Sequence, residues 1–197
     1  SIENADKYVY ALQIWQIPTN KSYPVSPGES VIIAQMADNH QKSTLNPASP
    51  VNLLSAEFET LVNTTSIILD NPAINMTMAF WPSPTPQWLT TVFGGAFVIF
   101  IPNEAINPAN YINPVGSTST KVYKIPIADV IDAVELVGNA NQVQLKRVPS
   151  VLDAGATTVG GTYLGVSVAR KIKTTLNDGR VIYYDSNNSS NDFEVMN

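Results

Sequence analysis

Short stretches in which hydrophobic and polar residues alternate follow one another along most of the chain, and clusters of turn-forming residues separate them. Such stretches are typical of β-strands, and their regular separation by turns is typical of a β-sandwich. Fourteen prolines also oppose long helices, because proline interrupts helical hydrogen bonding. The expected strands are residues 8–17, 30–37, 65–69, 74–80, 91–101, 142–148, 163–170 and 180–185.

Two segments have a pattern that suits a helix. Residues 52–59 place capping side chains ahead of Leu54 and Phe58, which repeat at helical spacing, so a short surface helix is expected there. The apolar residues of 127–137 suit either a helix face or an alternating strand. Pro126 offers a third possibility, a helical turn that runs into a strand. The prediction is an all-β fold with at most one or two short helices.

The length of 197 residues suits one substantial core and is short for two full domains joined by a linker. We therefore expect residues 1–197 to form a single β-sandwich domain. Two irregular insertions, 41–50 and 102–119, are long for hairpin loops. Loops of this kind on a β-scaffold are either functional surfaces or covers over a sheet edge.

Composition removes several classes of function. A net charge of −5 and a pI near 4.7 oppose nucleic-acid binding, which depends on clustered Lys and Arg. The longest apolar run, 92–101, contains Gly94 and Gly95 and is about half as long as a spanning helix, so no transmembrane segment is expected. The absence of cysteine excludes disulfides, thiolate zinc sites and thiol nucleophiles. No cofactor is predicted.

Catalytic chemistry has few candidate residues. The single histidine, His40, has no partner in sequence, and no Gly-x-Ser-x-Gly motif accompanies it. The enzyme alternative is a hydrolase in which Asp129, Asp132 and Glu135 act alone or with a metal. It requires at least two carboxylates that converge with raised pKa values. Their spacing of three also suits a solvated helix face, so we favour a protein that is not an enzyme.

Aromatic residues near loops are the candidate ligand contacts. Trp81 and Trp88 flank a proline-rich loop that could hold their rings against a sugar or a peptide at low entropic cost. Tyr111, in the second insertion, and His40, beside the first, complete this set. The alternative is that the tryptophans cover the core or a sheet edge, and that His40 caps a turn.

The segment 185–193 is dense in oxygen atoms. Asp185, Asn187 and Asp192 are therefore candidates for a weak calcium site, but the glycine and the glutamate of an EF-hand loop are missing. The alternative that we favour is structural: Asx and Ser side chains bind their own backbone, and Phe193 packs into the core.

Several segments together resemble the lamin tail domain, in the form of a lamin-tail-like domain of unknown function in surface lipoproteins of Gram-negative anaerobes. The ending, 185–193, is the most specific of them, because such domains finish in a sequence like Asp-Thr-Asn-Asn-Ser-x-Asn-Asp-Phe. Residues 65–119 carry no resemblance. The other similar segments are 10–12, 27–34, 56–58, 130–135, 152–155, 167–171 and 178–180.

The resemblance implies an immunoglobulin-like sandwich on the outer face of the outer membrane, associated with a TonB-dependent nutrient receptor or with other surface lipoproteins. It implies no catalytic residue. The first strand of the family is represented only by residues 2–4, so that strand is expected to be truncated or supplied by upstream sequence. A lipid anchor would likewise need a cysteine upstream.

The motifs shared with this family indicate a C-terminal clasp, formed by Arg170, Asp185, Asn188, Asp192 and Phe193. In this hypothesis Arg170 pairs with Asp185 or Asp192 and locks the tail. The leading functional hypothesis is an accessory binding or assembly protein at the cell surface. The alternatives are the carboxylate hydrolase and a purely structural adhesion or spacer domain.

Overall fold

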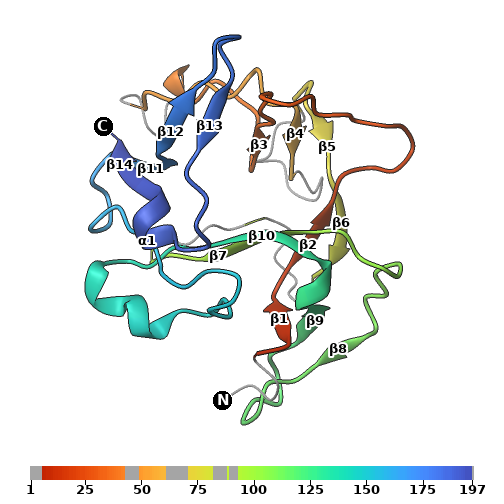
Figure 1. Cartoon of the computed structure of the whole chain (residues 1–197). Coiled ribbons are helices and arrows are strands. Elements are labelled where there is room, and N and C mark those ends of the chain that lie inside the picture. The colour runs from red at the N-terminus through yellow and green to blue at the C-terminus, as the bar shows by residue number, and fades with distance from the viewer. Residues whose placement is uncertain (1–5, 43–48, 61–70, 82–87, 89–92, 197) are drawn as a thin grey trace. The chain divides into compact units, whose positions relative to one another are not determined.

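The computed structural model describes residues 6–42, 49–60, 71–81, 88 and 93–196 (Figure 1). The chain divides into two compact units that interleave along the sequence. Unit 1 comprises residues 1–11, 90–105 and 111–197, and unit 2 comprises residues 12–89 and 106–110. No helix within the described residues is long and apolar enough to cross a membrane.

Antiparallel strand pairs make up most of the regular structure of unit 1. The first sheet has the order β1 (Tyr8–Ala11), β9 (Val122–Pro126) and β8 (Tyr111–Ile112). The other pairs are β7 (Ala96–Phe100) with β10 (Val130–Glu135), β11 (Ser167–Arg170) with β14 (Phe193–Met196), and β12 (Ile172–Thr175) with β13 (Val181–Tyr183). Two 3₁₀ helices, Ile127–Asp129 and Ala140–Leu145, and one short α-helix, α1 (Ser189–Asp192), complete the unit.

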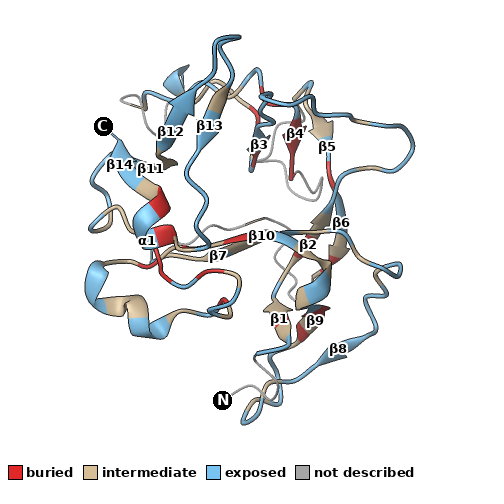
Figure 2. Cartoon of the chain, viewed as in Figure 1, coloured by how far each residue is buried: buried red, intermediate tan, exposed pale blue. Residues whose placement is uncertain are grey.

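Alternation within the strands places the core of unit 1. Val9 on β1 lies opposite Ile125 on β9, and both side chains are buried. They lie on the same face because directly opposed residues of an antiparallel pair point the same way. By contrast, every residue of β12 is exposed (Figure 2).

Unit 2 contains an antiparallel pair and a small parallel sheet. β2 (Ile14–Gln16) pairs with β6 (Thr77–Phe80), while β3 (Ile33–Ala34), β4 (Phe58–Glu59) and β5 (Ile74–Asn75) lie in parallel in that order. A third 3₁₀ helix covers His40–Lys42. The buried cluster beside β3 consists of the small residues Ala34, Ala37 and Ala56, with Leu53 and Ala73 packed on it.

The all-β prediction is confirmed, while the immunoglobulin-like arrangement stays a prediction. The segment 127–137 is a 3₁₀ helix followed by β10, which is the alternative that Pro126 indicated. The expected strand at 65–69 lies outside the described residues, as do residues 2–4 and 43–48. Strands β4, β8, β9, β12 and β14 were not expected.

Two predicted elements are wrong. The predicted helix at 52–59 is a turn that leads into β4, because Phe58 is buried there between β3 and β5. The predicted strand at 142–148 is instead a 3₁₀ helix, since the Asn139 side chain caps its start by accepting a hydrogen bond from the Asn141 amide. In both places local hydrogen bonding or burial overrides the apolar pattern.

Candidate functional site

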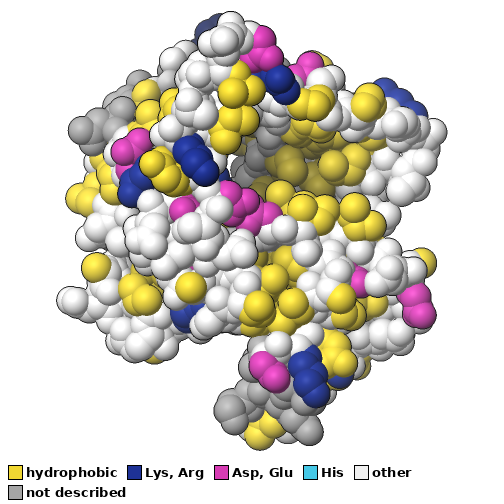
Figure 3. Space-filling view, in the orientation of Figure 1, with side chains coloured by type: hydrophobic (Ala, Val, Ile, Leu, Met, Phe, Trp, Pro, Cys, Tyr) yellow, Lys and Arg dark blue, Asp and Glu magenta, His cyan; other side chains and the backbone are white. Residues whose placement is uncertain are grey.

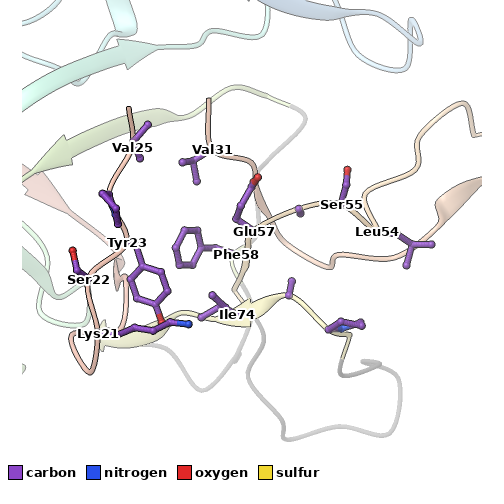
Figure 4. Close-up of a pocket in the computed structure, with 14 residues that line it drawn as sticks. Lys21, Ser22, Tyr23, Val25, Val31, Leu54, Ser55, Glu57, Phe58 and Ile74 are labelled. Atoms are coloured by element: carbon purple, nitrogen blue, oxygen red, sulfur yellow. The ribbon is translucent and has the colours of Figure 1, made fainter. Parts of the chain in front are cut away.

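Unit 2 carries an open groove of about 560 Å³ beside β4 and β5, which we call the unit 2 groove. Hydrophobic side chains gather there, where the surface is hollowed (Figure 3). Three segments far apart in sequence line it: 21–25 together with Val31, 54–58, and 72–74. Its principal side chains are Lys21, Tyr23, Val25, Val31, Leu54, Glu57, Phe58 and Ile74 (Figure 4).

A tight turn brings the first lining segment into place. Pro24 favours extended backbone at Tyr23. Beyond it, the Glu29 amide donates to the Ser26 carbonyl at 2.9 Å, and Gly28 adopts a φ of 89°. That conformation requires glycine, as in a type II turn. Val25 and Val31 therefore both reach the groove from the two sides of one turn.

An aromatic pair forms the floor of the groove. The rings of Tyr23 and Phe58 meet edge to face, with centroids 5.2 Å apart and planes at 74°. Phe58 is buried, because β4 lies between β3 and β5. Ile74 lies on β5, opposite Phe58 of β4, and extends this apolar floor (Figure 4).

Two charged groups lie on opposite sides of this floor (Figure 4). The Lys21 ammonium lies 5.0 Å from the centre of the Tyr23 ring, within the range of a cation–π contact. The Glu57 carboxylate accepts a hydrogen bond from the Ile32 amide at 2.7 Å, which holds its side chain in position. The groove thus suits a mostly apolar ligand with polar ends, as binding sites commonly do.

The four predicted ligand contacts lie in different parts of the chain. The His40 ring binds the Met36 carbonyl at 3.1 Å, a hydrogen bond within its own turn. Trp81 and Trp88 are half-buried, and the loop between them, 82–87, lies outside the described residues. Tyr111 belongs to β8 of unit 1, where the Lys121 ammonium lies 4.3 Å from its ring centre. None of the four lines the unit 2 groove.

The C-terminal clasp is built around Arg170. Its guanidinium pairs with Asp185 at 3.2 Å, one of its two predicted partners, and with Asp132 at 2.6 Å, which the sequence did not indicate. The same group lies 5.1 Å from the centre of the Phe193 ring, which is half-buried. Asn188 caps α1 by accepting a hydrogen bond from the Ser190 amide.

Asp192 holds the turn before α1 together. Its buried carboxylate accepts hydrogen bonds from the Ser186 amide and hydroxyl, at 2.8 and 2.7 Å, and from the Asn188 amide at 3.3 Å. Burial by itself would raise the pKa of Asp192, but these hydrogen bonds and the charge of Arg170 together hold the pKa below its usual value. The carboxylate is therefore an internal acceptor of the clasp.

A second buried carboxylate, Asp153, anchors the clasp to the rest of unit 1. It accepts hydrogen bonds from the Ser189 hydroxyl, from the Ser189 and Glu135 amides at 2.8 Å, and from the Gly155 amide at 3.0 Å. Ser190 binds both the amide and the carbonyl of Ala156. Asp153 belongs to the similar segment 152–155, and by accepting the Ser189 amide it ties the first residue of α1 to that segment.

The three carboxylates of the hydrolase alternative have separate partners. Asp129 binds Asn103, and Asp132 pairs with Arg170. Glu135 is fully buried and binds the Arg147 side chain, along with the amides of Arg147 and Val148 at 2.7 and 2.8 Å. Within the described residues, no group of three or more His, Asp or Glu side chains is placed to hold a metal ion.

Sequence reasoning missed the unit 2 groove and the Asp153 anchor. The signal for the groove was the Tyr-Pro-Val run directly before the Pro-Gly turn, which places apolar side chains on a stiff, extended segment. Leu54 and Phe58 were assigned to a helix, so their convergence with Tyr23 was not expected. A lone Asp between apolar residues, as at Asp153, gives no comparable signal.

Two comparisons with known proteins relate the chain to others. Residues 26–197 match a family model described as a protein of unknown function, DUF4876. The chain is also similar to the crystal structure of a DUF4876 family protein from Bacteroides thetaiotaomicron, with a TM-score of 0.86 and 39% sequence identity over 96% of this chain. No curated protein matches it.

This chain spans 54% of the length of the Bacteroides thetaiotaomicron protein. The family match covers the lining of the unit 2 groove from Val31 onward, and all of the C-terminal clasp. The chain therefore belongs to the DUF4876 family, whose function is unknown.

Proposed function

We propose that this chain is a non-catalytic binding module that holds an apolar ligand in the unit 2 groove. The observation that carries the proposal is the exposure of aliphatic side chains over a buried aromatic floor. Val25, Val31 and Leu54 are 54, 37 and 51% exposed, although they line the same groove as the buried Phe58. Grouped aliphatic side chains of this kind gain free energy when a partner covers them.

The geometry of the groove supports binding by a preformed surface. Tyr23 is fixed against Phe58, and Glu57 is tied to the Ile32 amide, so two of its groups need little ordering when a ligand arrives. Preorganised groups lose less conformational entropy on binding. Lys21 and Glu57 supply the polar contacts that orient a ligand.

The roles of the buried carboxylates support a protein without catalysis. Glu59, Glu135 and Asp153 are the largest fully buried side chains, and each accepts hydrogen bonds from backbone amides. A catalytic carboxylate must reach the substrate proton or the reacting atom. Carboxylates that are enclosed in this way serve the fold instead.

We further propose that the module works at the cell surface, as a lipoprotein associated with a TonB-dependent nutrient receptor of the outer membrane. This part of the proposal depends on the resemblance of the sequence motifs to lamin-tail-like domains of surface lipoproteins. The unit 2 groove is a candidate contact surface for it, in addition to the predicted tryptophan loop, whose residues 82–87 lie outside the described residues.

Titration with 8-anilinonaphthalene-1-sulfonate, a fluorescent apolar anion, tests the groove. Val31→Asp should weaken binding of this probe about tenfold, because it places a charge on the apolar lining. Val115→Asp is the matched control, since Val115 lies in unit 1 and is 75% exposed. Equal affinities for the two variants would contradict the proposed site.

Purification of the native complex from outer membranes tests the association. We expect recovery together with a TonB-dependent barrel, and weaker recovery for Val31→Asp than for Val115→Asp. Recovery of the protein alone, as a monomer, would contradict this part of the proposal. It would not bear on ligand binding in the groove, which the probe titration tests separately.

A further inference from the structure

The hairpin formed by β12 and β13 has no third strand in the part of the chain that the structure describes. A three-residue tip, 177–179, fixes its register, with Gly179 at a φ of 87° and the Arg180 amide bound to the Asp178 carboxylate at 3.1 Å. An isolated two-stranded hairpin is marginally stable in water, and each strand leaves one edge unpaired.

The two edges of this hairpin differ in how they are protected. A bulge between Ile172 and Thr174 interrupts β12, and Lys173 is exposed beside it. Bulges and lysines are the features by which natural edge strands avoid further pairing. β13, Val181–Tyr183, contains no charged residue. The extra residue of the bulge belongs to β12, so β13 itself contains no bulge.

The unpaired backbone groups of β13 follow from its hydrogen bonds. The Arg180 carbonyl accepts from Leu176, and the Tyr184 amide donates to Lys171 at 2.9 Å, so these residues face the partner strand. Because inward and outward residues alternate in an antiparallel pair, the amides of Val181 and Tyr183 point away from β12. Outside the β12–β13 ladder, no backbone hydrogen bond among the described residues involves either amide.

Charge and exposure at the hairpin indicate the chemistry of a partner. Residues 171–184 contain three cations and one carboxylate, a net charge of +2 in a chain whose total is −5. The side chains of Ile182, Tyr183 and Tyr184 are 42, 46 and 44% exposed. Arg180 pairs with Asp178, and Asp185, just beyond β13, pairs with Arg170, so the surplus positive charge comes from Lys171 and Lys173 on the β12 side. A complementary partner is therefore apolar where it contacts Ile182 and Tyr184, and acidic in net charge.

We infer that the β13 edge binds an extended, acidic segment of a partner protein by strand addition. The partner strand takes the outward amides of Val181 and Tyr183, and its apolar side chains lie against Ile182 and Tyr184. Backbone hydrogen bonds give affinity in this mode of recognition, and side-chain contacts give specificity. The site is separate from the unit 2 groove and belongs to unit 1.

Amide hydrogen exchange, measured by NMR with a synthetic peptide, tests the inference. The probe is acetyl-Glu-Glu-Val-Thr-Val-Glu-Glu-amide, and a peptide with lysines in place of the four glutamates is its control. The acidic peptide should slow exchange at the Val181 and Tyr183 amides at least about tenfold, because they become hydrogen-bonded. The basic peptide should leave both rates unchanged.

Two further measurements separate strand addition from other causes. An acidic peptide N-methylated along one edge should lose the protection, since that edge cannot pair. The Val181→Pro variant should also lose the peptide-induced protection, measured at the Tyr183 amide. Its melting temperature should stay unchanged, because proline is tolerated on an edge whose amide faces outward. If Val181→Pro unfolds, the result with the N-methylated peptide alone tests strand addition.

Three results would overturn the inference. The first is protection that is equal for acidic and basic peptides. The second is protection of amides that line the unit 2 groove, in place of those of β13. The third is protection of Val181 and Tyr183 that rises with protein concentration in the absence of peptide, which would identify a second copy of the chain as the occupant.

Discussion

The C-terminal clasp and the unit 2 groove use their polar and apolar groups in opposite ways. In the clasp, the buried carboxylates of Asp153 and Asp192 take up amides and hydroxyls that would otherwise be unpaired. In the groove, the side chains of Val25 and Leu54 remain half exposed. The contacts of the clasp therefore serve stability, whereas the exposed groove is where we propose that a ligand binds.

The C-terminal segment shows that a dense cluster of polar residues can serve the fold. The segment 185–193 has the oxygen-rich composition of an ion site, yet the carboxylate of Asp192 is engaged with its own backbone. The groove has no recognisable motif. Substitutions should therefore lower the free energy of unfolding in the clasp and lower affinity in the groove.

Asp153→Ala should have the largest effect on stability. It leaves the amides of Glu135, Ser189 and Gly155 buried without an acceptor, so we expect a loss of about 3 to 5 kcal/mol in the free energy of unfolding. Urea unfolding followed by circular dichroism measures it. A loss below about 1 kcal/mol would show that Asp153 does not anchor the clasp.

Gly155→Ala should come next. A Cβ at this position would overlap Asn188 Oδ1 and Ser190 Oγ and lie 2.9 Å from the Ser190 amide nitrogen, so α1 must shift. We expect a loss of about 2 kcal/mol. Gly161→Ala is the control, because its nearest neighbour is a Leu164 side-chain carbon at 3.6 Å, and its stability should change little. Similar unfolding curves for both variants would contradict close packing at Gly155.

Asp192→Asn should lower stability by about 1 kcal/mol at neutral pH, through loss of a charged acceptor. The folded-state pKa of Asp192 is lowered, so the ionised form adds stability above its ordinary pKa of 3.8. That contribution disappears as pH falls through the lowered value. Urea unfolding should be measured from pH 7 to about pH 2. The difference in the free energy of unfolding between variant and wild type should narrow below about pH 4. A constant difference would contradict this role.

Val25→Ser should have the smallest effect on stability, within about 0.5 kcal/mol, because Val25 is more than half exposed. The same change should weaken binding of 8-anilinonaphthalene-1-sulfonate several-fold. Thermal unfolding and the probe titration together check both statements. A large loss of stability would place Val25 in the core of unit 2 and remove it from the binding surface.

The fold class was predictable because it depends on local pattern. Proline content and short alternating segments indicated strands, and Pro126 indicated the 3₁₀ helix that leads into β10. The helix predicted around Leu54 is wrong because Phe58 pairs with two strands that are distant in sequence, and the local pattern of residues gives no sign of that pairing. Exposed strands such as β12 also escape prediction, since they lack the buried alternate residues that the pattern requires.

The candidate site was harder to predict than the fold. The pairing of Arg170 with Asp185 was one of two expected arrangements, because both residues belong to the C-terminal motif. Asp132, its second partner, lies 38 residues away and gave no local signal. The groove requires three separate segments to converge, and only their tertiary arrangement brings Tyr23 to Phe58.

Mapping the probe titration by NMR chemical shifts tests most directly whether the unit 2 groove is the binding surface. Addition of 8-anilinonaphthalene-1-sulfonate should shift the amide and methyl signals of Val25, Val31 and Leu54, and leave those of Ser189 and Ser190 in the clasp unchanged. Shifts centred on the clasp, or spread evenly over both units, would contradict the assignment of binding to the groove.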